Sequence, residues 1–199
     1  ERLDAVVYSH AHADHLHGID DIRGYFITQK NRIPIYAEPY TMARIEEGFG
    51  YCLETPLGSS YPPIVAPYVI EDMDQPIVVE GAGGAITMMP LMQEHGDIVS
   101  IGLRIGNVAY CCDVSDFPEE TVAKLSGLDL LYIDALQYRP HPSHLSLEQA
   151  LRWIERFAPK HSVLTHMHTP LDYETVMGET PQHVEPGYDQ FVMEFEVDI

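Results

Sequence analysis

The sequence predicts an α+β protein in which helices cover the outer faces of β-sheets. Strand-like apolar runs alternate irregularly with helix-like segments along the 199 residues, a length that fits one domain. The residues able to do chemistry come directly after strand-like runs, where a sheet holds side chains in place. They are His10 to His15, His95, Asp113, Asp134 and His166. This recurrence predicts one site at the ends of several strands.

The first part of the chain predicts a strand, two helices and two further strands in the order β, α, β, α, β. The expected ranges are 3–7, 19–27, 33–36, 39–47 and 64–70. Because Pro34 lacks an N–H group, its strand should lie at a sheet edge, or Pro34 should lie at the strand end. Gly48 and Gly50 are expected to end the second helix. A loop rich in proline follows at 55–63.

The second part of the chain predicts mainly strands. Strand-like runs occupy 77–80, 85–92, 98–105, 108–112, 128–133, 163–164 and 191–197. Gly106-Asn107 is a two-residue hairpin signal. A helix at 118–125 carries Pro118 in its first turn. Ser146 and Gln149 form a capping box before a helix with an apolar stripe. The stripe consists of Leu147, Ala150, Leu151, Ile154 and Phe157.

Composition excludes several classes of partner. The formal net charge is −20, from 31 acidic against 11 basic residues, which disfavours a nucleic-acid polymer because binding to phosphate backbones depends on Lys and Arg. No apolar stretch reaches the ~20 residues of a membrane span. The sequence has three cysteines, two of them adjacent, a number and spacing that predict no disulfide framework. A location in the reducing cytoplasm is therefore expected. Cys111 and Cys112 should point to opposite faces of a strand as packing residues.

The segment Ser9 to Gly18 carries the densest set of metal-binding side chains. His10 and His12, two residues apart after a buried strand, are expected to share a face and hold one ion. Asp14 and His15 lie beyond the turn and can reach a second ion. The alternative is a loose surface chelator, since histidine-rich tracts also occur without a defined site.

Three further segments each offer one ligand: His95, Asp113 and His166. Each alone has an ordinary structural explanation, such as a helix cap for Asp113. Only the joint pattern indicates a metal site. Imidazole nitrogen and carboxylate oxygen suit Zn, Mn or Fe, and no thiolate is among the expected ligands.

This ordered set of histidines and aspartates resembles the metallo-β-lactamase superfamily of dinuclear hydrolases. The resemblance implies an αββα sandwich forming a single domain over 1–199, whose usual first strands are missing from this sequence. It implies two divalent ions per chain, Mn or Zn. His10, His12 and His95 would hold one ion. Asp14, His15 and His166 would hold the other, and Asp113 would bridge the two.

Three runs, 10–23, 138–148 and 165–173, resemble the PhnP-like cyclic phosphodiesterases, which open a five-membered cyclic phosphate on a ribose phosphate. The resemblance implies attack of a metal-bound hydroxide on a small cyclic or nucleotide-like phosphate, with Asp14 in the catalytic centre. It places His144 near the leaving group, where Asp134 is expected to orient it. The expected substrate contacts are His17, Arg139, His141 and His168.

Two departures from that group and two alternative functions stay open. The N-terminal cysteines of a separate structural zinc site are not in this sequence. Ala13 stands where the similar tRNA 3′-end endonucleases favour Gly, and no basic insertion resembles their protruding arm. The alternatives are a thioester or lactam hydrolase on the same metals and a non-catalytic metal-binding scaffold. A homodimer is expected from the family resemblance alone.

Overall fold

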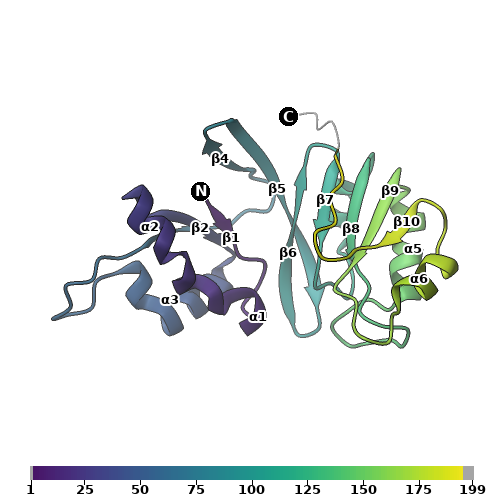
Figure 1. The fold of residues 1–199 in the computed structure, drawn as a ribbon, viewed down its shortest axis with the longest axis horizontal. Helices are drawn as coiled ribbons and strands as arrows, with labels where there is room; N and C mark the ends of the chain where they lie inside the picture. The colour runs from purple at the N-terminus through teal and green to yellow at the C-terminus, as the bar shows by residue number, and fades with distance from the viewer. Residues whose placement is uncertain (1, 195–199) are drawn as a thin grey trace. The chain divides into compact units, whose positions relative to one another are not determined.

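The structure is a computed structural model that describes residues 2–194 (Figure 1). The described chain divides into two compact units. The first runs to Met73 and also includes Val78–Ile86, and the second comprises the rest. Each unit has its own buried apolar cluster, built around Ile35 and Ile45 in the first and around Leu131 and Ile133 in the second.

The first unit contains a three-stranded parallel sheet in the order β1-β2-β3. Its strands are β1 (Val6–Val7), β2 (Ile33–Ala37) and β3 (Val65–Val69). Between β1 and β2 the chain forms α1 (Ala13–Leu16), the 3₁₀ helix η1 (His17–Ile22) and α2 (Arg23–Gln29). Helix α3 (Pro39–Leu53) connects β2 to β3. These crossovers follow from the parallel pairing, which a tight turn cannot make.

Several features of this unit differ from those that the sequence predicts. The first strand has two half-buried residues instead of five buried ones, and the helical segment begins at Ala13. Pro34 lies in the central strand, near its start. It is tolerated because β1 pairs only with Ile35 and Tyr36, so no β1 residue requires an N–H group from Pro34.

Gly48 and Gly50 do not end helix α3, which continues to Leu53. The residue between them, Phe49, leaves the helical conformation, with φ −133° and ψ 25°. The glycine pair therefore produces a kink inside the helix, as small flexible residues commonly do.

A larger sheet has the order β10-β9-β8-β7-β6-β5-β4, and Val78–Ile86 at its β4 end is counted with the first unit. Its strands run antiparallel from β5 to β7 and parallel from β7 to β10. They are β4 (Ile77–Gly81), β5 (Gly84–His95), β6 (Ile98–Ile105), β7 (Val108–Cys111), β8 (Leu130–Asp134), β9 (His161–Thr165) and β10 (Val184–Pro186). Its helices are α4 (Glu119–Lys124), α5 (Leu147–Phe157) and α6 (Tyr173–Glu179).

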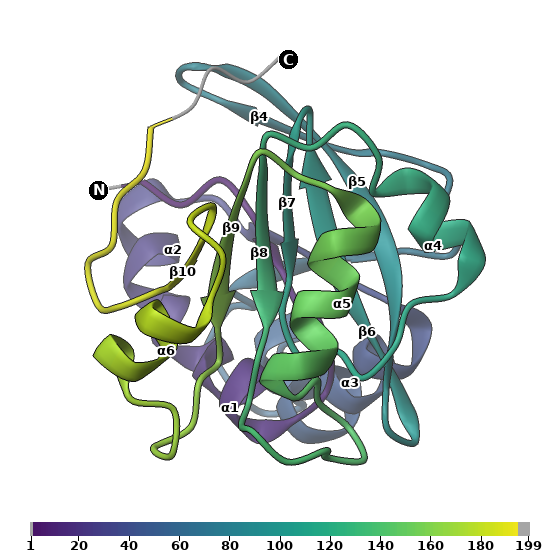
Figure 2. The same ribbon diagram turned by 90° about the vertical axis from the view of Figure 1, so that its right-hand side faces the viewer.

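Helix α5 shows the expected capping and packing. The Ser146 hydroxyl accepts a hydrogen bond from the Gln149 N–H at 3.3 Å, and the Gln149 side chain accepts one from the Ser146 N–H at 2.9 Å. Figure 2 shows the helix on the near side of the sheet, next to β8, and Ala150 and Ile154 are buried on it. The capping box and the apolar stripe are confirmed.

The remaining sequence predictions for this unit are mixed. The Gly106-Asn107 hairpin is confirmed, with Gly106 at φ +55°. Helix α6 and strand β10 were not predicted. Residues 191–194 are not a strand, and the rest of the strand expected at 191–197 lies outside the described residues. Among the described helices, none has the length and apolar character needed to traverse a lipid bilayer.

Candidate metal centre

The predicted ligands form two groups, one in each unit. The first group lies on the loop after β1 and on α1 and consists of His10, His12, Asp14 and His15. The second group lies at the ends of strands and consists of His95, Asp113 and His166.

The first group converges around the imidazole of His10. Its Nε2 lies 3.0 Å from Nδ1 of His12, close to the roughly 3.3 Å that separates two nitrogens on one tetrahedral zinc ion with 2.0–2.1 Å bonds. The ring centroids of His10 and His15 are 4.4 Å apart, and His15 Nε2 lies 3.2 Å from Asp14 Oδ2. The strand-face explanation was wrong, because β1 ends at Val7 and the loop brings the side chains together.

In the second group, the Asp113 carboxylate turns one oxygen toward each histidine. Oδ2 lies 3.7 Å from His95 Nε2, and Oδ1 lies 3.5 Å from His166 Nε2. His95 ends β5, Asp113 follows β7 and His166 follows β9. Each oxygen of the Asp113 carboxylate thus lies near a different histidine, an arrangement in which one carboxylate can serve as a ligand together with both imidazoles.

Two of these predicted ligands have an uncommon backbone conformation. Asp113 has φ +54° and His166 has φ +60°, both in the left-handed region that residues other than glycine rarely adopt. Such strain costs about 1–3 kcal/mol per residue and gathers at functional sites, where the surrounding structure maintains it. The strand-end positions of Asp113 and His166 are therefore held by their surroundings and not by local preference.

The imidazole of His95 is oriented by a loop distant in sequence. Its Nδ1 donates a hydrogen bond to the Ser143 carbonyl at 2.6 Å, which leaves Nε2 as the nitrogen that faces Asp113. Gly96, at φ +61°, allows this approach, since a Cβ atom there would lie 2.9 Å from the Ser143 Cβ. An outer contact of this kind is typical of histidines that bind metals.

His144 lies beside His95 and His166 and is hydrogen-bonded to Asp134. Its Nδ1 is 2.7 Å from Asp134 Oδ2, which also accepts a hydrogen bond from the Val114 N–H at 3.1 Å. Its ring stacks on that of His166 with centroids 4.8 Å apart. Burial raises the pKa of the Asp134 carboxyl, and the hydrogen bond with His144 opposes part of that rise.

The four expected substrate contacts do not form one cluster within either unit. His141 lies next to His144, with ring centroids 5.2 Å apart. His17 is exposed and packs its ring edge-on against Phe49. Arg139 and His168 are exposed on the loops after β8 and β9.

Cys112 is a neighbour of the site that the sequence pattern did not indicate. Cys111 belongs to the core cluster, as expected, but the Cys112 thiol donates to Asp113 Oδ1 at 2.9 Å. Burial raises the pKa of this thiol, and the Asp113 carboxylate adds to the rise. Adjacent strand residues point to opposite faces, so two neighbouring cysteines before Asp113 could not both point into the core cluster. This alternation was the sequence feature that could have indicated Cys112.

The residues present fit divalent metal ions. Each group combines imidazole nitrogens with carboxylate oxygen, the donor set preferred by Zn, Mn and Fe in hydrolytic sites. Asp113 and His95 are buried, so their polar atoms require partners other than bulk water.

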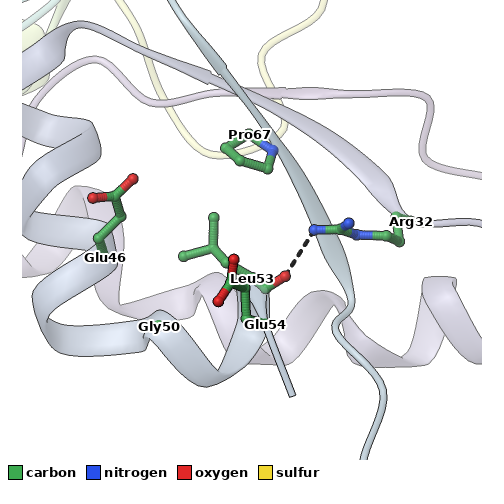
Figure 3. A pocket seen from close by; sticks show the side chains of 6 residues that line it. All are labelled: Arg32, Glu46, Gly50, Leu53, Glu54 and Pro67. Atoms are coloured by element: carbon green, nitrogen blue, oxygen red, sulfur yellow. Dashed lines mark hydrogen bonds between the residues drawn. The ribbon is translucent and has the colours of Figure 1, made fainter. Parts of the chain in front are cut away.

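The cavity in Figure 3 is separate from this chemistry. It has a volume of about 540 Å³, lies within the first unit and contains none of the predicted site residues. Its Arg32 guanidinium already donates to the carbonyls of Leu53 at 2.8 Å and Val65 at 2.6 Å. A second cavity, of about 440 Å³, opens beside His166 in the second unit, with Tyr110 and Tyr132 in its wall.

Comparison with known structures identifies the fold. The chain is similar to a crystal structure described as a new diphosphatase from the PhnP family, with 31% identity and a TM-score of 0.85, over 98% of this chain and 73% of that chain. It is also similar to the metallo-β-lactamase fold protein YhfI from Bacillus subtilis, with 20% identity and a TM-score of 0.72, over 95% of this chain and 76% of that one.

Sequence comparison adds a curated relative and a family model. An octanoyltransferase from Porphyromonas gingivalis is 33% identical over 194 aligned positions, and the match covers 95% of this chain and 37% of the relative. The chain thus spans little more than a third of the relative that bears this name. The model of the beta-lactamase superfamily domain matches residues 1–167. The chain therefore has the metallo-β-lactamase fold and belongs to the beta-lactamase superfamily.

Proposed function

We propose that this protein is a metal-dependent phosphodiesterase that acts on a small cyclic or nucleotide-like phosphate. The observation that carries the proposal is the Asp113 carboxylate, which turns one oxygen toward His95 and the other toward His166 beside the hydrogen-bonded pair of His144 and Asp134. The similarity to a diphosphatase from the PhnP family supports phosphorus as the reacting centre.

We assign the two ligand groups to one dinuclear centre in a single catalytic domain. One ion would take His10, His12 and His95, the other would take Asp14, His15 and His166, and Asp113 would bridge them. Structural and catalytic zinc ions are usually bound by three or four protein ligands each. Two ions therefore need about six or more ligands. Neither the three residues of the second group nor the four of the first can provide them alone. Mn and Zn both suit this set of donors.

When bound, the two ions supply a nucleophile from water and stabilise charge on the phosphoryl oxygens. The chain's own contribution is proton transfer. The Asp134 carboxylate accepts the Nδ1–H of His144, which fixes the ring and directs Nε2 toward substrate. His144 would then protonate the leaving oxygen as a general acid. His17, Arg139, His141 and His168 are proposed to contact the substrate.

The acidic character of the chain supports a small substrate. With a net charge of −20, a long polyanion would be repelled over most of the surface, whereas a single phosphate is attracted locally by bound cations. We therefore propose neither a nucleic-acid polymer nor a membrane as partner. A homodimer and a cytoplasmic location belong to the same proposal.

The experiment is metal analysis together with turnover of bis(p-nitrophenyl) phosphate after Mn or Zn is restored. We expect about two metals per chain. Asp113→Ala and His12→Ala, one variant from each group, should both lose metal and cleavage. The exposed His161→Ala is the matched control and should behave as wild type. If His12→Ala keeps both ions and full activity, the two groups do not serve one centre.

The second candidate is acyl hydrolysis on the same metals, which the name of the octanoyltransferase relative favours. It predicts metal-dependent cleavage of an octanoyl thioester and none of the phosphodiester. Two bound metals with neither activity would instead indicate the non-catalytic scaffold.

A further inference from the structure

A buried polar network lies directly behind Asp113. Gln93 on β5 and Ser100 on β6 are register partners, and both are fully buried. The Gln93 amide donates to the Ser100 hydroxyl at 2.9 Å and to the Cys112 carbonyl at 3.0 Å. Side-chain hydrogen bonds therefore connect β5 and β6 to the residue that follows β7, in addition to the backbone hydrogen bonds of the sheet.

This network holds both the backbone and the side chain of Asp113. The Ser100 hydroxyl donates to the Asp113 carbonyl at 2.7 Å. The Cys112 thiol donates to the Asp113 carboxylate at 2.9 Å. Because Asp113 has φ +54°, its backbone has left the strand conformation and its carbonyl is not paired in the regular ladder.

The sheet makes room for this network at Gly102. A Cβ atom at that position would lie 2.4 Å from Gln93 Oε1 and 2.9 Å from the Tyr110 carbonyl. Only glycine therefore allows the Gln93 side chain to lie across β6. Burying a polar side chain costs free energy that its hydrogen bonds must offset, and a buried polar network fixes one arrangement of the groups that it joins.

We propose that Gln93, Ser100 and Cys112 are positioning residues that hold Asp113 in its left-handed conformation, with its carboxylate turned toward both His95 and His166. This inference rests on the proposed metal-dependent function. Without the network, Asp113 would relax toward an ordinary strand-end conformation, and its two oxygens would lose their separate directions. Groups that orient metal ligands typically change metal affinity by about 10- to 100-fold when they are removed.

The test measures the zinc dissociation constant by competition with a chromogenic chelator, together with thermal unfolding of the metal-free protein. Ser100→Ala removes the donor to the Asp113 carbonyl and should weaken zinc binding by about 10- to 100-fold. Cys112→Ala should also weaken it. Cys112→Ser, which keeps a donor at that position, should restore most of the affinity.

Two matched controls separate positioning from packing. Thr121→Val removes a buried hydroxyl that donates to the Met92 carbonyl at 2.6 Å, away from Asp113. Cys111→Ala truncates the adjacent cysteine on the opposite face. Both should lower the unfolding temperature and leave the zinc dissociation constant within about twofold of wild type, because neither touches the network.

The proposal is overturned if Ser100→Ala unfolds like Thr121→Val and binds zinc as tightly as wild type. If Ser100→Ala does not fold, equal zinc affinity of Cys112→Ala and Cys112→Ser overturns it. If the wild-type protein binds zinc but cleaves no phosphodiester, only the proposed reaction is refuted. The positioning role is still tested, because its measurement is zinc affinity. A wild-type protein that binds no zinc overturns both.

Discussion

Nδ1 of His144 lies 2.7 Å from Oδ2 of Asp134, and the Asp134 side chain is completely buried. The carboxylate is fixed at the end of β8, and its second partner is the backbone N–H of Val114. A histidine held in this way presents its other nitrogen in one orientation, which a general acid requires.

The pair leads to the first prediction. His144→Ala should lower turnover of a phosphodiester by about 10²–10⁴-fold while both metals remain bound, because it removes proton donation and no assigned ligand. The measurement is kcat beside metal content, with the exposed His161→Ala as control. Unchanged kcat would remove His144 from the reaction.

The second prediction concerns metal removal. A chelator should lower the unfolding temperature, and added Zn or Mn should restore it, because ions that bind only the folded chain stabilise it. At a free ion concentration 100 times the dissociation constant the effect is about 2.7 kcal/mol. The measurement is a thermal melt at several zinc concentrations. An unfolding temperature that does not depend on zinc would contradict a specific site.

The third prediction concerns pH and the start of helix α6. Asp172 Oδ1 accepts hydrogen bonds from the Thr175 N–H at 3.0 Å and the Thr175 hydroxyl at 2.8 Å, which lower the pKa of this carboxyl. Because the folded-state pKa is depressed, the stabilisation is present above the unfolded pKa of about 3.9. It is lost as the pH falls through the folded-state value.

Asp172→Asn should therefore reduce the acid-dependent loss of stability that wild type shows. The measurement is the free energy of unfolding of both proteins from neutral pH down through the acidic range. Glu174→Gln changes the same charge on the same helix and is the matched control. Parallel pH profiles for wild type and Asp172→Asn would refute the assignment.

The fourth prediction concerns Ala158, the residue that ends helix α5. It has φ +48° and ψ 50°, a left-handed conformation that costs an L-residue roughly 1–2 kcal/mol. Ala158→Gly should raise the free energy of unfolding by about 1 kcal/mol, as measured in urea. Ala150→Gly, inside the same helix, should lower it. Destabilisation by Ala158→Gly would show that the methyl group packs usefully.

The sequence alone predicted the features that depend on nearby residues. Strand β6 has its expected bounds, the Gly106-Asn107 turn joins β6 to β7, and Ser146 caps helix α5. These features follow from side-chain periodicity and from hydrogen bonds between residues a few positions apart. The residue types able to bind metal were equally visible, because imidazole and carboxylate groups following strand-like runs need no tertiary information to be recognised.

The sequence could not predict features that depend on contacts between distant segments. The Ser143 carbonyl that orients His95 lies 48 positions along the chain, and Ser100 lies 13 positions from the Asp113 carbonyl that it holds. Pro34 is tolerated in a central strand only because β1 pairs with so little of β2. Residue chemistry and local order therefore come from the sequence. The left-handed conformation of Asp113, the directions of its two oxygens and the roles of Gln93 and Cys112 come only from the packing of β5, β6 and β7 against one another.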